Sequence, residues 1–249
     1  PQQAQMLAAA LRHEPSGSGE EIEVAIRRFH IWGARLAPWD APAALADARG
    51  GVCAYSTRLQ ADRTYVVTGA LGGVGCHVLR WMLACGARHV VLVTRSQATL
   101  ERRAAVLDEL RATCPSARMQ VHVLDVGDGQ AVRQLLRRVG EEWPPIDGIF
   151  HLAGGLDDGL VKDLDWERCA AVIGGKADGA SHLHLASVEL RLQLSHFVLF
   201  SSVYALLGYA QLTHYAAANA CLEAIALHRR ACGLPAVAIQ WGLWHDEHP

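Results

Sequence analysis

Lysine is scarce in this 249-residue chain, where only Lys162 and Lys176 occur. A strong charge of either sign is also missing, because the formal net charge is −2. This balance leaves no electrostatic footprint for nucleic acid, so the basic pairs 102–103 and 137–138 are predicted to be solvated helix faces. The sequence further lacks an apolar run of about eighteen residues and a signal-peptide pattern, and so predicts no membrane-spanning segment.

Metal-binding and disulfide patterns are absent from the sequence as well. The seven cysteines form no CxxC pair and have no regular spacing, so they are predicted to be small buried hydrophobes in a reducing compartment. Among the thirteen histidines, His182 and His184 stand two apart, which places them on different faces of a helix. No carboxylate or cysteine cluster completes a site around them, and no metal is expected.

The chain does show a regular alternation of apolar runs and amphipathic segments. Its hydrophobic content of 51% over 249 residues is enough for a sizeable core. The predicted strands are 65–68, 89–94, 119–124, 146–152, 196–201 and 235–241. The predicted helices are 76–86, 98–113, 128–142, 165–190 and 211–232. Because parallel strands need right-handed helical crossovers, we expect an α/β fold with a doubly wound, Rossmann-like parallel sheet in the order 3-2-1-4-5-6.

A glycine-rich turn joins the first of these strands to the first helix. Gly69, Gly72 and Gly75 follow the apolar run 65–68 in the spacing G-x-x-G-x-x-G, one residue wider in its first gap than the usual dinucleotide fingerprint. Such glycines let the backbone approach a pyrophosphate, whose charge is met by the free N–H groups of the helix start. A plain turn is the alternative, but the position between a strand and a helix favours a dinucleotide site.

The end of the second strand indicates which dinucleotide would bind. An acidic residue there grips the ribose 2′-hydroxyl of NAD, whereas a cation accommodates the 2′-phosphate of NADP. The sequence reads Thr94-Arg95-Ser96, and the next acid is Glu101. NADPH is therefore the predicted cofactor, and a solvated turn arginine is the alternative. The residues expected at the cofactor site are Thr68, Gly69, Leu71, Gly72, Gly73, Val74, Gly75, Arg95, Ser96, Asp125, Val126, Ala153 and Gly154.

A tyrosine and an asparagine stand one helical turn apart in the last predicted helix. Tyr215 and Asn219 are separated by four positions, so they share one helix face. A phenol there could donate a proton to a reacting oxygen, but its reference pKa of about 10 means that it needs a nearby ammonium group. The candidate lysine, Lys176, lies far upstream. A helical turn with a surface tyrosine is the alternative.

Several segments together resemble one enzyme family. They are TYVVTGALGGVG, VLVTRS, VLDV, GIFHLAGGLDDGL, GGKADGASHLH, FVLFSSVYALLGYAQLTHYAAANACLEAIALHRRACGLPA and WGLW. Residues 64–245 are similar to the catalytic half of the ketoreductase domain of a polyketide synthase, a branch of the short-chain dehydrogenase/reductase superfamily. In this family the catalytic lysine and asparagine exchange places relative to ordinary short-chain reductases, which accounts for the pairing of Tyr215 with Asn219.

The resemblance implies an activity and a role for each of four residues. The implied reaction is the NADPH-dependent reduction of a β-ketoacyl thioester, held on the phosphopantetheine arm of an acyl carrier protein, to the β-hydroxyacyl thioester. Tyr215 would protonate the developing alkoxide, and Ser202 would hydrogen-bond the substrate carbonyl oxygen. Lys176 would bind the nicotinamide ribose and lower the pKa of the tyrosine. Asn219 would hold the lysine and a proton-relay water in place.

The same resemblance implies the stereochemistry of the product. Leu156, Asp157 and Asp158 resemble the LDD loop that accompanies B-type reduction to the 3R alcohol. Leu207 stands where A-type domains carry tryptophan, and Gln211 begins the Q-x-x-x-Y-x-x-x-N arrangement. A plain polar turn at the two aspartates is the alternative.

The two ends of the sequence indicate a piece of a larger synthase. Residues 61–249 are expected to form the NADPH-binding catalytic subdomain, and residues 1–60 a linker or a remnant of the family's structural subdomain. Too few residues follow Trp244 for the lid helix and seventh strand of the family, so a truncated C-terminus is expected. In the N-terminal part, helices are predicted over 1–13 and 20–31, a linker over 15–19 and a strand over 52–59.

The implied partners are the carrier protein and the other domains of the same synthase, with neither nucleic acid nor membrane. The expected location is the cytoplasm, and an organelle stays open. Two functional alternatives also stay open. One is a structural or redox-silent ketoreductase-like domain that reduces nothing, and the other is the ketoreductase of an animal-type fatty acid synthase.

Overall fold

The computed structural model describes residues 24–27, 30–33 and 59–244 of the chain. The chain divides into two compact units, 1–55 and 56–249, each of which is described by itself. The predicted helix over 1–13 and linker over 15–19 lie outside the described residues. The predicted strand over 52–59 also lies outside them except for Leu59, which is not in a strand.

The described part of the first unit is a β-hairpin. Strands β1 (Val24–Arg27) and β2 (His30–Gly33) pair antiparallel, with two residues between them. The predicted helix over 20–31 is therefore wrong where the structure describes it. Glutamates favour a helix start, but β-branched residues alternate with other residues from 22 to 26, and this period of two favours a strand.

The second unit contains a six-stranded sheet in which all neighbouring strands are parallel. Its order is β5-β4-β3-β6-β7-β8, so the predicted order 3-2-1-4-5-6 is confirmed. Every residue of the central strands β3 and β6 is buried, as a parallel sheet covered on both faces requires. The strands are β3 (Thr64–Thr68), β4 (His89–Thr94), β5 (Arg118–Val123), β6 (Ile146–His151), β7 (His196–Ser202) and β8 (Val237–Trp241).

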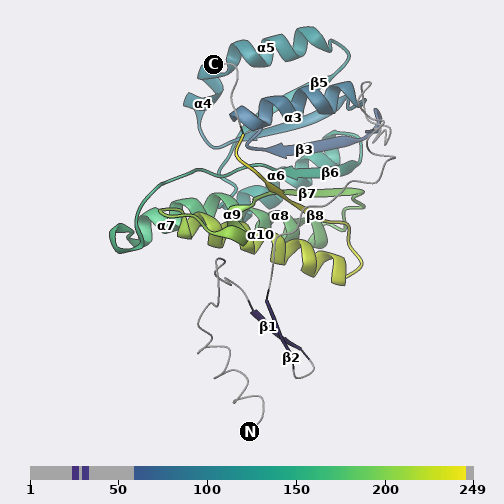
Figure 1. The fold of residues 1–249 in the computed structure, drawn as a ribbon. Helices are drawn as coiled ribbons and strands as arrows, with labels where there is room; N and C mark the ends of the chain where they lie inside the picture. The colour runs from purple at the N-terminus through teal and green to yellow at the C-terminus, as the bar shows by residue number, and fades with distance from the viewer. Residues whose placement is uncertain (1–23, 28–29, 34–58, 245–249) are drawn as a thin grey trace, which may run out of the picture. The chain divides into compact units, whose positions relative to one another are not determined.

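Helices cover both faces of this sheet (Figure 1). One face carries α3 (Gly73–Ala84), α4 (Gln97–Arg102) and α5 (Ala104–Thr113). The other carries α6 (Gly129–Glu142), α7 (Trp166–Ile173), α8 (Gly179–Glu189) and α10 (Thr213–Ala231). Shorter segments are η2 (Val161–Asp163), the π-turn η3 (Gly174–Asp178) and α9 (Tyr204–Leu207).

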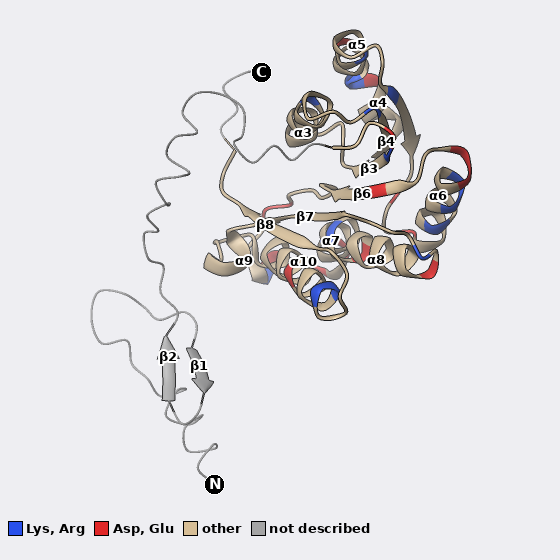
Figure 2. Cartoon of the chain, turned by 90° about the vertical axis from the view of Figure 1, so that its right-hand side faces the viewer, with Lys and Arg blue, Asp and Glu red and all other residues tan. Residues whose placement is uncertain are grey.

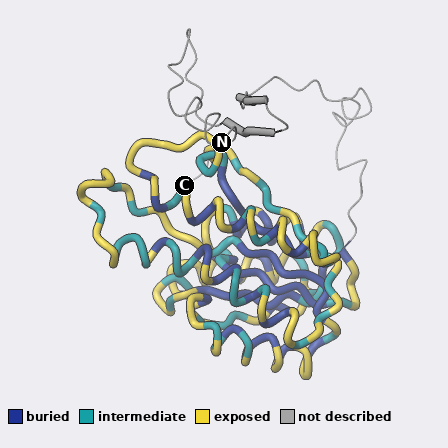
Figure 3. The backbone as a smooth tube through the Cα atoms, turned by 90° about the horizontal axis from the view of Figure 1, so that it is seen from below, coloured by how far each residue is buried: buried dark blue, intermediate teal, exposed yellow. Residues whose placement is uncertain are grey.

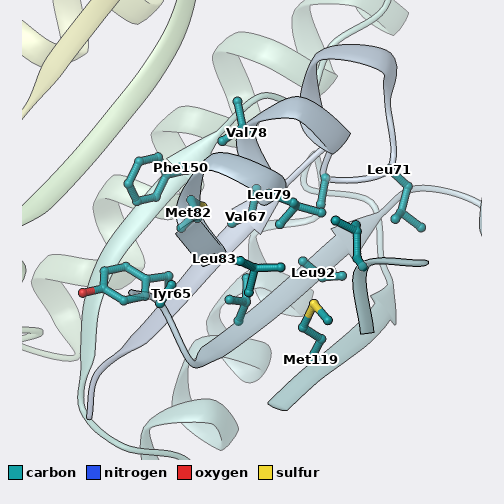
Figure 4. Close-up of a cluster of buried hydrophobic side chains, with 14 of the residues drawn as sticks. Tyr65, Val67, Leu71, Val78, Leu79, Met82, Leu83, Leu92, Met119 and Phe150 are labelled. Carbon is teal, nitrogen blue, oxygen red and sulfur yellow. The ribbon is translucent and has the colours of Figure 1, made fainter. Parts of the chain in front are cut away.

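The hydrophobic core lies in two layers, one on each face of the sheet. Figure 4 shows the first layer, in which Leu79, Met82 and Leu83 of α3 pack toward Val67 and Leu92 of the strands. The second layer packs α6, α8 and α10 against the opposite face. In the described part of the second unit, Figure 3 shows burial concentrated in the strands, and Figure 2 shows charged residues mostly on the helices.

Several predicted boundaries differ from those in the structure. The predicted helix over 98–113 is two helices, because Arg103 (φ −108°, ψ 9°) leaves the helical conformation. The predicted helix over 165–190 is likewise interrupted by the π-turn η3, and α9 was not predicted. The prediction of buried cysteines is wrong for Cys221 and Cys232, which are exposed.

Candidate active site

The glycine turn connects β3 to α3 at the carboxyl edge of the sheet. Gly69 has a φ of +67°, and a Cβ atom there would lie 2.7 Å from the backbone nitrogen of Ala153. A Cβ atom on Gly75 would lie 2.4 Å from the carbonyl oxygen of Ala70. Both positions therefore exclude larger residues. Because these residues have no side chains, the backbone of the turn itself lines the cavity described next.

A cavity of about 440 Å³ opens above this turn. Most residues predicted at the cofactor site line it, namely Gly69, Gly72, Gly73, Val74, Gly75, Arg95, Ser96, Asp125, Val126, Ala153 and Gly154. Thr68 and Leu71 are both buried and do not line it. The loop backbone, the start of α3 and the exposed arginine fit a dinucleotide with a phosphorylated ribose.

A second arginine lines the same cavity. Arg102, predicted to be a solvated residue, lies on α4 and lines the cavity together with Arg95 and Thr99. Its Nη2 atom donates to Thr99 Oγ1 at 3.4 Å, across one turn of the helix. Arg95 is predicted because it follows the end of the second strand. No sequence pattern predicts Arg102, because its position depends on how α4 packs.

A second cavity of about 340 Å³ adjoins the first. The two cavities share Val74, Leu152, Gly154 and Gly155 as lining residues. The second is also lined by Lys176, Ser202 and Tyr215, from η3, the end of β7 and α10 respectively. Three of the four predicted catalytic side chains therefore meet in one place. Asn219 lies behind them, fully buried, where its Nδ2 donates to the carbonyl oxygen of Tyr215 at 2.9 Å.

Lys176 is a buried amine at the bottom of this cavity. Only 5% of the residue is exposed, and its Nζ donates to the carbonyl oxygen of Phe200 at 2.9 Å. Nζ also lies 5.3 Å from the centroid of the Tyr215 ring. Burial lowers the pKa of Lys176 from 10.5 to about 8, so the side chain is still mostly protonated at neutral pH. The site thus places a positive charge beside the phenol.

A buried histidine supports the π-turn that carries Lys176. The Nε2 atom of His151 lies 2.9 Å from the carbonyl oxygen of Lys176, and its Nδ1 lies 2.7 Å from Thr68 Oγ1. A carbonyl oxygen can only accept, so Nε2 carries the proton and Nδ1 accepts from the threonine hydroxyl. Burial lowers the pKa of His151 to about 4, which keeps the ring neutral. Thr68, predicted to touch the cofactor, bonds to His151 and so supports η3 through the histidine ring.

The remaining contacts of the four predicted catalytic residues differ in part from expectation. Ser202 Oγ accepts from the backbone N–H of Tyr204 at 3.3 Å, which leaves its own proton for another acceptor. No hydrogen bond among the described residues joins Asn219 to Lys176, although the resemblance implies that one holds the other. The Oδ1 atom of Asn219 is buried and has no partner among the described residues.

The residues predicted to control stereochemistry do not all reach the cavity. Leu156 lines it, whereas Asp157 and Asp158 are not lining residues and contact Arg168 of α7. Leu207 is 43% exposed at the end of α9. Gln211 has a φ of +72° just before α10, and neither residue lines the cavity.

Comparison with known proteins assigns the family. A family model described as the KR domain matches residues 63–246. The chain belongs to the KR domain family. This KR domain is 40% identical over 230 residues to the polyketide synthase GfsB of Streptomyces halstedii, which covers 92% of the chain and 4% of that protein. The chain therefore spans a small part of a much longer relative.

Solved structures agree with this family. The KR domain is 33% identical to the first ketoreductase of the tylosin PKS, with a TM-score of 0.76 over 98% of this chain and 49% of that one. A structure of A-type ketoreductases from a modular polyketide synthase is also 33% identical, with a TM-score of 0.71 over 92% of this chain and 46% of that one. Fold alone therefore does not assign the stereochemical type.

The predicted family and fold are confirmed by these matches. KR domains of polyketide synthases are oxidoreductases of the short-chain dehydrogenase/reductase superfamily, and they bind a nicotinamide cofactor. Within the described residues, no helix is long and apolar enough to cross a membrane. The same residues contain no group of three or more histidine, cysteine, aspartate or glutamate side chains arranged to hold a metal ion.

Proposed function

We propose that this KR domain uses NADPH to reduce the ketone of a β-ketoacyl thioester carried by an acyl carrier protein within a polyketide synthase. The product is a β-hydroxyacyl thioester with a 3R alcohol, as formed by B-type reduction. The observation that supports this proposal is the meeting of Lys176, Ser202 and Tyr215 in one cavity that adjoins the glycine-turn cavity. The other domains of the synthase are the proposed partners.

The proposed chemistry assigns a separate task to each side chain. The reduced nicotinamide, when bound, supplies a hydride to the β-carbon of the ketone. Ser202 donates its hydroxyl proton in a hydrogen bond to the ketone oxygen and so polarises the carbonyl group. Tyr215 then transfers its phenolic proton to the oxygen, which completes the alcohol. The Lys176 ammonium group stabilises the phenolate that remains.

Two arginines support NADPH rather than NADH. Arg95 and Arg102 both line the larger cavity, where a ribose 2′-phosphate would bring its negative charge. Phosphate recognition by guanidinium groups is charge-assisted and directional. Asp125 lines the same cavity, but its Oδ1 already accepts from the backbone N–H of Gly127 at 2.9 Å.

The proposed proton donor is tested by removing one hydroxyl group. We expect Tyr215→Phe to lower the rate of NADPH oxidation with a β-ketoacyl-N-acetylcysteamine thioester by about 10²- to 10⁴-fold, the usual contribution of a general acid. Tyr209→Phe is the matched control, because Tyr209 is 61% exposed and lines neither cavity. Full activity of Tyr215→Phe would refute the assignment. No turnover by the wild-type chain and by its parent synthase would favour a redox-silent domain.

A further inference from the structure

Arg168, on the first turn of α7, makes four hydrogen bonds to the loop that follows β6. Its Nε donates to Asp157 Oδ2 at 2.8 Å, and its Nη2 donates to Asp157 Oδ1 at 2.6 Å. Nη2 also donates to the carbonyl oxygen of Asp158 at 2.8 Å, and Nη1 to that of Asp163 at 3.1 Å. One guanidinium group thus holds a carboxylate in a two-point contact and two backbone carbonyls of the same loop.

The loop packs directly on this guanidinium group. A Cβ atom on Gly159 would lie 2.9 Å from both Nη atoms of Arg168. The arginine is itself fixed from the other side, because its backbone N–H donates to Asp165 Oδ1 at 2.9 Å in the N-cap of α7. A lysine could supply the charge at this position but not the planar fork. The contact is therefore specific for arginine.

A second contact joins the loop to the segment that carries the proposed proton donor. The backbone N–H of Gly159 donates to the carbonyl oxygen of Gln211 at 2.9 Å. Gln211 has a φ of +72°, in the left-handed region that a residue with a side chain adopts at a cost in free energy. Tyr215 follows one turn later in α10. The loop therefore spans from α7 to the start of α10.

This loop presents Leu156 to the cavity and directs the neighbouring carboxylate toward α7. Leu156 lines the cavity with Lys176, Ser202 and Tyr215, whereas Asp157 does not. The hydrogen bonds from Arg168 hold the pKa of Asp157 below its usual value, so the carboxylate is charged at neutral pH. Asp157 thus contacts Arg168 and does not reach the cavity in which a substrate would bind.

From these contacts we infer that Arg168 is a positioning residue that fixes Leu156 at one side of the cavity and thereby selects the direction from which the acyl chain enters. The inference rests on the proposed reduction. Tyr215, Ser202 and the cofactor site are fixed, so the face of the ketone that receives hydride depends on how the chain lies between them. Reduction from the two faces gives alcohols of opposite hand. A fixed Leu156 favours one of them.

Charge explains why the loop needs this arginine. Asp157, Asp158 and Asp163 lie within seven consecutive positions of the loop, and like charges at short range repel each other. Without Arg168, the Asp157 carboxylate and two carbonyl oxygens would lose the partners described above. The loop would then turn its carboxylates to water and leave Leu156 unfixed.

The inference is tested with two measurements on the same variants of the full chain. The variants are Arg168→Ala, Arg168→Lys, Asp157→Asn and the double variant of alanine and asparagine. Arg133→Ala is the control, because Arg133 also pairs with a carboxylate, its Nη1 donating to both oxygens of Glu189 (2.9 and 3.2 Å), and it lines neither cavity. Amide hydrogen exchange of residues 156–163 reports on the loop. Chiral analysis of the alcohol formed from a β-ketoacyl-N-acetylcysteamine thioester reports on selectivity.

In Arg168→Ala we expect faster exchange at the Gly159 amide. We also expect the ratio of 3R to 3S alcohol to fall about tenfold, the effect of losing one charge-assisted contact. Asp157→Asn should change the exchange rate and the alcohol ratio by the same amounts. The double variant should show no larger change than either single variant, and Arg133→Ala should match the wild type. Arg168→Lys should restore the ratio only in part. Unchanged exchange in Arg168→Ala refutes the tether, and faster exchange with an unchanged ratio refutes its role in selectivity.

The outcomes separate this inference from the proposed function. A wild-type chain that makes the 3S alcohol overturns the B-type assignment, but the loss of selectivity in Arg168→Ala would still support the positioning role. A wild-type chain that makes no alcohol overturns the proposed function and, with it, the part of the inference that concerns selectivity. Hydrogen exchange then decides whether Arg168 holds the loop.

Discussion

Lys176 carries a buried ammonium group, and burying this charge lowers the stability of the fold. Replacing the lysine with methionine removes the charge. The pKa of Lys176 falls from 10.5 to about 8 because burial penalises the charged form. That difference corresponds to about 3 kcal/mol of unfolding free energy at neutral pH. The hydrogen bond from the ammonium group to the carbonyl oxygen of Phe200 would be lost, at a cost of about 2 kcal/mol. We therefore expect Lys176→Met to stabilise the fold by about 1 kcal/mol while abolishing reduction.

The same reasoning fixes how this gain depends on pH. Below about pH 8 the lysine is protonated in both the folded and the unfolded chain, so the wild type carries the whole penalty. Between about pH 8 and 10.5 the unfolded chain binds more protons than the folded one, so the stability of the wild type rises with pH. The penalty is absent above this window. The difference between the methionine variant and the wild type should close across it.

Urea unfolding followed by tryptophan fluorescence at about pH 7 and about pH 10 measures the difference. Lys162→Met is the matched control, because Lys162 is the other lysine of the chain and is exposed. Its unfolding free energy should equal that of the wild type at both values. A Lys176→Met variant that is less stable than the wild type at neutral pH, or a gain that is the same at both, would refute the reasoning.

Two further predictions concern the cofactor cavity. Arg95→Ala and Arg102→Ala should each raise the KM for NADPH about tenfold, because each removes one charge-assisted contact. The KM for NADH should stay nearly unchanged. If steady-state kinetics show the same loss with both cofactors, the phosphate contact is refuted. Gly75→Ala should lower stability by about 1–3 kcal/mol in thermal unfolding, because its Cβ atom would meet backbone at 2.4 Å. Gly73→Ala, where a Cβ atom meets nothing within 4 Å, is the control, and equal stability of the two variants would contradict the close approach.

The parts of the fold that sequence patterns predict are those governed by local chemistry. Strands β3 and β4 read as nearly continuous apolar runs because both faces of a parallel sheet are buried at its centre. The start of α6 follows from Asp128, whose side chain accepts from the backbone N–H groups of Gln130 and Ala131. The glycine turn is fixed by close approaches of the backbone, which leave a visible spacing of glycines.

The parts that sequence patterns miss depend on contacts between distant residues. Arg102 reaches the glycine-turn cavity because of how α4 lies beside β4. Asp157 does not line the cavity of Lys176 and Tyr215, because it contacts Arg168, which lies on a helix eleven positions later. Thr68 lies at the end of the first strand, and its hydrogen bond to His151 likewise depends on a residue that is distant in sequence. No local pattern distinguishes these outcomes from the expected ones.

The π-turn at Gly174–Asp178 makes the length of this helical region as important as its composition. One residue more or fewer in a helix rotates everything beyond it by about 100°, since a turn takes 3.6 residues. Deleting one residue here would restore the regular hydrogen-bond ladder, yet it would change the direction of Lys176 relative to α8 and release His151 from its carbonyl partner. A shorter helix would then be more regular, but the Lys176 ammonium group would no longer lie beside the Tyr215 phenol.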